Sequence, residues 1–113
     1  MHADAKKLLW DAHRAAERVA RFTHARSCDD YIADEFLRSA VERQLEIVGE
    51  ALNRLRRIDE DTAALIVELP RVVGFRNVLI HGYASVDNRV VWGIVEADLP
   101  PLLEKLKALL GQA

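Results

Sequence analysis

The sequence has few of the residues that build disulfides, linkers or membrane spans. Its 113 residues include one cysteine, three prolines and five glycines, with no repetitive or low-complexity tract. Cys28 has no second cysteine to pair with, which excludes an internal disulfide and indicates a reducing compartment or indifference to one. No apolar run approaches the length of a transmembrane helix, and the N-terminus lacks a signal region. We therefore expect one domain over residues 1–113, in the cytoplasm and without a membrane partner.

Motifs for metal and phosphate-loop sites are also missing. The chain has no His-Glu-x-x-His, no paired Glu-x-x-His and no phosphate-binding glycine loop, and Ser39 and Ser85 have no evident triad partners. We therefore expect no metal and no cofactor. The net charge of −2 and the pI near 6.1 argue against a protein that coats nucleic acid in bulk. They are compatible with a locally basic cleft, because steering depends on how charge is distributed.

The chain does contain a series of amphipathic helical segments. Half of its residues are hydrophobic and 30% are charged, as in an ordinary globular domain. Apolar residues recur at spacings of three and four, and no segment alternates long enough to predict a strand. We predict helices over residues 5–25 and 34–57, a short turn of helix around Tyr31, a short helix over 60–68, and a helix that starts at Pro70. The predicted fold is a small, antiparallel, all-α bundle of four to six helices.

The C-terminal part is predicted to hold two further helices. Asp87 is the expected N-cap of the first, and Pro100-Pro101 is expected to interrupt it, with Asp98 capping a new start. The first should turn Val90, Val91, Ile94 and Val95 inward, and the second Leu102, Leu103, Leu106, Leu109 and Leu110. At the other end of the chain, Asp4 and the turn over residues 27–30 are the expected helix starts.

The predicted helix over residues 34–57 has an apolar arc that covers about half of its circumference. One face is formed by Leu37, Val41, Leu45, Val48, Leu52 and Leu55, and the arc is widened by Phe36, Ala40, Ile47, Ala51 and Ile58. One neighbouring helix cannot cover such an arc, so we expect the surplus to be buried against a second copy of the chain. Gly49, on the flank of the arc, would permit another helix to approach closely.

The opposite side of this helix is expected to be a charged, solvated face. Arg43 with Glu46, and Glu50 with Arg54, have the spacing of intrahelical ion pairs. Three arginines, Arg54, Arg56 and Arg57, cluster at the C-terminal end, where cations complement the helix dipole. A phosphate-binding patch is the alternative interpretation of that cluster.

The stretch over residues 72–83, Val-Val-Gly-Phe-Arg-Asn-Val-Leu-Ile-His-Gly-Tyr, differs because it sets polar groups among apolar ones. Such groups cost free energy beside a core unless they find partners. On a helix, Asn77 and His81 share one face, whereas Arg76 lies roughly 140° from His81 and Tyr83 falls back near Arg76. Either Gly82 ends the helix and redirects Tyr83, or a second chain completes the site. The alternative is a core histidine and a buried arginine that join one helix to its neighbours.

Arg76 and His81 are the pair that could carry chemistry. A histidine near its natural pKa can move a proton at neutral pH, and an arginine can clamp a phosphoryl oxygen. Attack by an RNA 2′-hydroxyl on its own phosphodiester needs those two kinds of help and no metal. The residues therefore favour metal-free RNA cleavage as the candidate chemistry.

These residues also carry a resemblance. Arg76-x4-His81-x-Tyr83 matches the Arg-x4-His-x-Tyr motif of the HepT-like branch of the HEPN superfamily. Arg-Gln-Leu-Glu-Ile-Val-Gly-Glu-Ala (residues 43–51) resembles the second-helix signature of that branch, and Val91-Trp92 with Asp-Leu-Pro (residues 98–100) resembles its C-terminal half. The likeness extends over nearly the whole chain.

The resemblance implies a HEPN-like helical homodimer with a cleft at its two-fold axis, acting as a metal-independent endoribonuclease toxin. It implies that Arg76 holds the scissile phosphate, that His81 serves as general acid or base, and that Asn77 orients the site. It also implies an MNT-type nucleotidyltransferase antitoxin that transfers AMP from ATP onto Tyr83. The alternative is a non-catalytic helical dimer that binds such a transferase or presents Tyr83 to it; the intact Arg76, His81 and Tyr83 favour the toxin.

Overall fold

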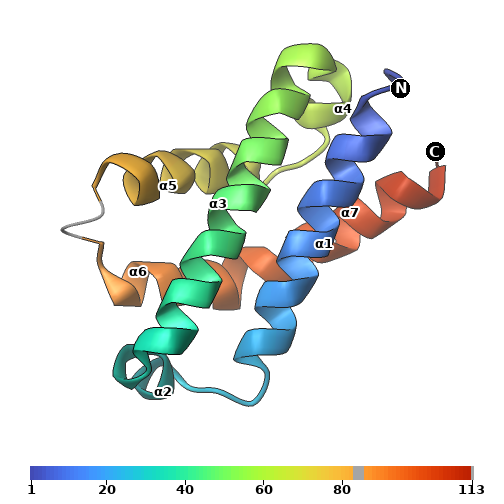
Figure 1. Cartoon of the computed structure of the whole chain (residues 1–113). Coiled ribbons are helices and arrows are strands. Elements are labelled where there is room, and N and C mark those ends of the chain that lie inside the picture. The colour runs from blue at the N-terminus through green and yellow to red at the C-terminus, as the bar shows by residue number, and fades with distance from the viewer. Residues whose placement is uncertain (83–85, 113) are drawn as a thin grey trace.

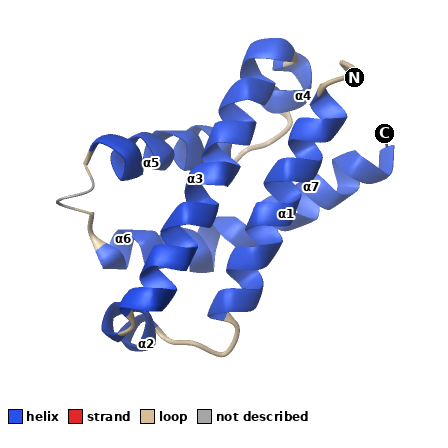
Figure 2. Ribbon diagram, viewed as in Figure 1, coloured by secondary structure: helices blue, strands red, loops and turns tan. Residues whose placement is uncertain are grey.

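The computed structural model describes residues 1–82 and 86–112; Tyr83, Ala84, Ser85 and Ala113 lie outside the described residues. The described chain is helical and contains no strand (Figure 2). In chain order its elements are α1 (Ala5–Thr23), α2 (Cys28–Ala33), α3 (Glu35–Ile58), α4 (Glu60–Ala64), α5 (Leu69–His81), α6 (Asn88–Gly93), the π-helical turn η2 (Ile94–Asp98) and α7 (Leu99–Gln112). The prediction of an all-α fold is confirmed.

The core is centred on α1, which packs against both α3 and α7, and on α3, which also packs against α5. In Figure 1, α1 and α3 run side by side in opposite directions, with α7 against α1 and α5 against the far side of α3. Each long helix buries one apolar stripe in this core. The stripe of α3 is the predicted one, since all six residues of its central face are buried: Leu37, Val41, Leu45, Val48, Leu52 and Leu55.

The wider part of the α3 arc does not form one continuous patch. Helix α3 packs against α1, α2, α4 and α5 of its own chain, so these neighbours cover much of the surface that a second copy was expected to bury. Ala51 is buried and Ile47 is half-buried, whereas Phe36 is 87% exposed. The apolar arc of α3 therefore gives little support to a dimer.

Side-chain caps fix most of the helix starts. Asp34, Asp59 and Asp87 each accept a backbone N–H from the first turn of the helix that follows. Ser27 and Asp30 form a reciprocal capping box at the start of α2, and the N–H of Ser27 lowers the pKa of the Asp30 carboxyl. Asp4 stands at the predicted start of α1 but its side chain makes no capping hydrogen bond.

The end of α1 comes two residues before the predicted one. Ala25 has a φ of 58°, in the left-handed region where a side chain is disfavoured. The short helix α2 that follows buries Tyr31 completely, and its ring lies 5.6 Å from that of Trp92. Burial raises the pKa of Tyr31 well above its usual range.

The prediction that Pro100-Pro101 breaks the last helix is wrong. The axis continues from α6 through η2 into α7, because the N–H of Leu99 reaches back to the carbonyl of Ile94 in a wide π turn. Such a turn loosens the helix just before the two prolines, whose rings would crowd a regular one. Asp98 does not cap a new helix but forms an ion pair with Arg71 of α5, with Nε and Oδ2 2.8 Å apart.

The inward residues of this part are mostly as predicted. Val91, Ile94 and Val95 are buried, as are Leu102, Leu106 and Leu109, whereas Leu103 and Leu110 are half-buried. Val90 is an exception because it is exposed. None of the described helices has the length and apolar character needed to cross a membrane.

Candidate active site on helix α5

Helix α5 presents the motif residues and is held mainly by α3. Pro70 lies in its first turn, as predicted, where the missing N–H costs no helical hydrogen bond. Gly82 forms its C-cap, so the prediction that this glycine ends the helix is confirmed. The φ of Gly82 is −113°, which other residues can also adopt. The predicted site residue Tyr83 comes next and lies outside the described residues.

Arg76 lies on the side of α5 that faces α3. Its side chain is 22% exposed, and its Nη2 lies 2.5 Å from a carboxylate oxygen of Glu50. Its Nη1 donates to Oδ1 of Asn77 at 3.1 Å. These contacts use two of the five N–H donors of the guanidinium. Arg76 therefore reaches the surface as a cation that is already oriented by a carboxylate and an amide.

Gly49 explains how Arg76 comes so close to α3. A Cβ atom at position 49 would lie 2.3 Å from Cβ of Arg76 and 3.3 Å from the carbonyl oxygen of Val72. Any side chain there would push the two helices apart. The predicted close approach at Gly49 is thus present, and it occurs within one chain.

His81 lies on the opposite side of α5, in its last turn, and is exposed. Asn77 is exposed one turn earlier on the same side. Arg76 is thus brought together with Asn77, but His81 makes no hydrogen bond or ion pair with either residue. The alternative of a core histidine is excluded by this exposure, whereas a half-buried arginine that joins two helices is what the structure contains.

The exposed side of α5 carries small and polar residues together with one apolar residue. Gly74, Asn77, Val78 and His81 follow one another along it, and Val78 is 47% exposed. A Cβ added at Gly74 would meet nothing within 4 Å. Glycine inside a helix costs about 1 kcal/mol relative to alanine, and contacts within the chain do not account for it at this position.

Glu50 is a residue of the candidate site that sequence reasoning missed, because its carboxylate pairs with Arg76. Its spacing to Arg54 predicted an intrahelical ion pair, but its carboxylate pairs with Arg76 instead, whereas the predicted Arg43–Glu46 pair is present at 3.2 Å. A contact between α3 and α5 overrides the local rule here. The signal available in the sequence was the neighbouring Gly49, which marks where a second helix comes close. Among the residues that the structure describes, no group of three or more His, Cys, Asp or Glu side chains is placed to hold a metal ion.

Comparison with known proteins identifies the family to which the chain is similar. The family model described as "Ribonuclease HepT-like" matches residues 12–109. The protein named "Putative RNase MJ1380" of Methanocaldococcus jannaschii is 35% identical over 106 residues, which cover 92% of this chain and 94% of the relative. The "Probable ribonuclease HepT" of Thermococcus cleftensis is 37% identical over 106 residues, with the same coverage. No solved structure gives a significant match.

The family match covers most of the chain, including the whole of α5 with its Arg-x4-His spacing. The chain belongs to the HepT-like ribonuclease family.

Proposed function

We propose that the chain is a metal-independent endoribonuclease that acts as the toxin of a toxin–antitoxin pair. The observation that carries the proposal is the pair Arg76 and His81 at the family spacing, on a helix whose His81 side is open to a substrate. Family membership supports RNA as the substrate class.

In the proposed reaction the RNA supplies its own nucleophile. The 2′-oxygen attacks the adjacent phosphorus, the bond to the 5′-oxygen breaks, and a 2′,3′-cyclic phosphate is left on the upstream product. His81 moves a proton as general acid or base, and Arg76 stabilises the charge on the phosphoryl oxygens with the donors that Glu50 and Asn77 leave available.

A homodimer is part of the proposal because one chain separates its two main residues. Arg76 faces α3, whereas His81 lies on the exposed side of α5 with Asn77. A second copy that packs against this exposed side would bring its own residues to the same cleft. Gly74 supports that arrangement, because its bare backbone permits a close approach from outside the chain. A symmetric interface of this kind places each motif helix beside its copy.

The first test is cleavage of purified tRNA and total RNA in the presence of EDTA. Wild-type protein should cut RNA and leave 2′,3′-cyclic phosphate ends, detected by mass spectrometry of the products. Replacement of His81 by alanine should lower the rate by about 10²–10⁴ if proton transfer limits it. Arg76→Ala is the second inactive variant, and Lys107→Ala on α7 is a control that should cut normally.

Activity that EDTA abolishes and magnesium restores would contradict the mechanism. A protein that binds a nucleotidyltransferase tightly but never cuts RNA would instead support a non-catalytic dimer. That alternative draws on the pairing of Arg76 with Glu50, which gives the arginine a structural role of its own.

Neutralisation by an MNT-type nucleotidyltransferase is the regulatory part of the proposal. AMP on Tyr83, two residues after His81, would place a negative phosphate and a bulky base where the RNA phosphate must bind. Co-expression with such a transferase should add the mass of AMP to the wild-type chain and none to Tyr83→Phe, measured by intact mass and peptide mapping. An unmodified tyrosine in a neutralised complex would mean that the partner acts by binding alone.

A further inference from the structure

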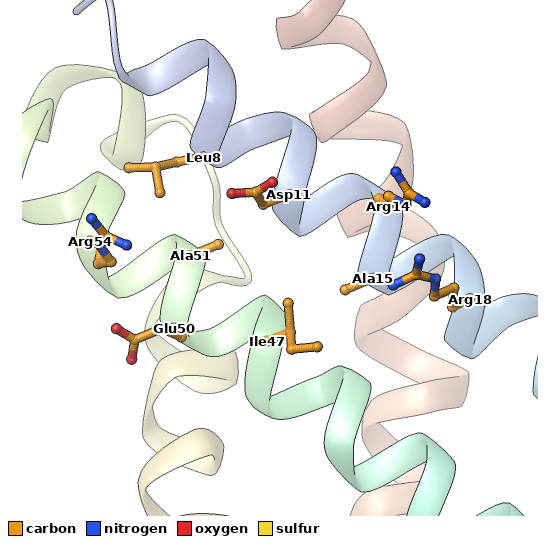
Figure 3. A pocket seen from close by; sticks show the side chains of 9 residues that line it. All are labelled: Leu8, Asp11, Arg14, Ala15, Arg18, Ile47, Glu50, Ala51 and Arg54. Carbon is orange, nitrogen blue, oxygen red and sulfur yellow. The ribbon is translucent and has the colours of Figure 1, made fainter.

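A groove between α1 and α3 lies next to the candidate site and is lined by three arginines. Its volume is about 170 Å³. Figure 3 shows Arg14 and Arg18 projecting from α1 near one end of the groove and Arg54 from α3 near the other. Its floor is apolar, with Leu8, Ala15, Ile47 and Ala51. The chain as a whole is slightly acidic, so a cluster of this sign is a local feature of these two helices.

The charges in the groove do not cancel, because its two acidic residues are already paired. Asp11 forms an ion pair with Lys7 at 3.1 Å, and Glu50 forms one with Arg76 at 2.5 Å. Both carboxylates are therefore paired with cations that do not line the groove. The three arginines that remain have no acidic partner within the described part of the chain.

Neutral contacts hold two of these arginines in place. The guanidinium of Arg14 stacks over the ring of Trp10, 5.0 Å from its centroid. Arg18 donates to the side-chain oxygen of Gln44 at 3.5 Å. Such contacts orient a guanidinium without neutralising it. Arg54 is exposed and makes no hydrogen bond or ion pair in the described structure, so its charge faces solvent.

Size and layout favour a chain of phosphates over a single small ligand. Pockets for drug-sized molecules occupy about 300–1,000 Å³, more than this groove offers. Cations at both ends suit anions that are spaced along a backbone, and Arg binds phosphate oxygens in a bidentate manner. Glu50 lines the groove and also contacts Arg76, so the groove and the motif arginine lie on either side of one side chain.

We propose that Arg14, Arg18 and Arg54 bind the phosphate backbone of single-stranded RNA that extends from the scissile bond at Arg76 along the groove between α1 and α3. This subsite rests on the proposed ribonuclease function, which supplies its substrate. It adds a length preference to that function, because long RNA reaches the groove and very short RNA does not. It also gives Arg54 a phosphate-binding role, where the sequence favoured a role in complementing the helix dipole.

The test measures binding and cleavage separately. A 20-nucleotide RNA with 2′-O-methyl groups cannot supply the attacking 2′-oxygen, so its affinity is read by fluorescence anisotropy without turnover. The variant Arg14→Gln/Arg18→Gln/Arg54→Gln should bind it more weakly, with a plot of log affinity against log salt that is shallower by about 2. That difference amounts to roughly 20-fold between 50 and 200 mM salt.

The charge-matched control is Lys6→Gln/Lys105→Gln/Lys107→Gln, which removes three cations outside the groove and should keep the wild-type slope. Arg54→Gln alone is the variant least able to disturb folding, and it should lower the slope by about 0.7. Cleavage of a dinucleotide by the groove variants should match wild type, because the dinucleotide does not reach the groove.

The outcomes distinguish the two proposals. A groove variant that binds the methylated RNA as tightly as wild type overturns the subsite, whatever the cleavage assay shows. A wild-type protein that binds through the groove but never cuts unmodified RNA keeps the subsite and overturns the ribonuclease. A loss of binding that is equal in the charge-matched control also overturns the subsite, because only net charge would then matter.

Discussion

At the scale of single residues, two ion pairs that involve α3 differ in their surroundings. Arg43 and Glu46 pair along the solvent face, with the arginine 68% exposed. Glu50 pairs across to Arg76, which is half-buried where α5 crosses α3 at Gly49. Exposed pairs contribute less than about 1 kcal/mol to stability. We therefore expect the Glu50–Arg76 pair to contribute mainly by orienting the Arg76 side chain.

Replacement of Glu50 by alanine should lower RNA cleavage more than it lowers stability. We expect kcat to fall by about tenfold to a hundredfold because Arg76 loses its orientation, with a change of less than about 1 kcal/mol in the free energy of unfolding. Single-turnover kinetics and urea denaturation measure the two effects. Glu50→Gln keeps an oxygen acceptor for the guanidinium and should recover part of the rate.

Glu46→Ala is the matched control, since it removes an ion pair of the same type from the same helix. It should leave both cleavage and stability close to wild type. Equal losses in Glu50→Ala and Glu46→Ala would show that the pair with Arg76 has no special role.

At the scale of elements, α5 packs mainly against α3 and leaves one side open. The residues of its inner side are buried, and α3 is its main neighbour: Leu69, Val72, Val73, Phe75 and Leu79. Its outer side carries Gly74, Asn77 and His81. Two glycines mark the two sides: Gly49 of α3 where α5 is in contact, and Gly74 of α5 where nothing in the chain is near.

Alanine at these two glycines should change stability in opposite directions. Gly49→Ala forces its new Cβ into Arg76 and should cost about 1–3 kcal/mol, as overpacking does. Gly74→Ala meets no atom of the chain and should stabilise the monomer by about 0.5–1 kcal/mol. Urea denaturation at concentrations where sedimentation shows monomer provides the measurement.

The same Gly74→Ala variant should dimerise more weakly, because its methyl group would stand in the proposed interface. Sedimentation equilibrium of wild type and variant checks this point. A variant that is more stable and dimerises as wild type does would place the interface elsewhere on the molecule.

At the scale of the whole molecule, the positions of Arg76 and His81 raise the question of how many chains make one site. Within one chain they lie on different sides of α5. In a two-fold dimer each site can take Arg76 from one protomer and His81 from its partner. Two variants that are each inactive can then form mixed dimers that contain one intact site.

Mixing Arg76→Ala with His81→Ala protein should restore cleavage that neither shows alone. If subunits exchange at random, about half of the dimers are mixed and each has one intact composite site of two, so about a quarter of wild-type activity should return. The assay is the rate of RNA cleavage after incubation at a concentration that permits exchange. A mixture as inactive as its components would mean that each site draws both residues from one chain.

Local patterns in the sequence predicted the all-α class, the inner stripe of α3, the C-cap of α5 at Gly82 and a helix start at Pro70. Helix α5 begins one residue before this proline, at Leu69. These features follow from local rules: apolar spacing, the fixed φ of proline, and caps that lie within three residues of the N–H they accept. The candidate residues Arg76, Asn77 and His81 were also identified from sequence, because polar groups in an apolar stretch stand out.

Which side chains meet depends on how the helices pack against one another. The pairing of Glu50 with Arg76 in place of Arg54, and of Asp98 with Arg71 in place of a helix cap, depends on helices far apart in the chain. The helix continues through Pro100-Pro101 because of a π turn that no local sequence pattern predicted. The arginine groove likewise forms only where α1 lies antiparallel to α3. Spacing along one helix fixes which face a side chain occupies, but the partner on that face is set by how the helices cross.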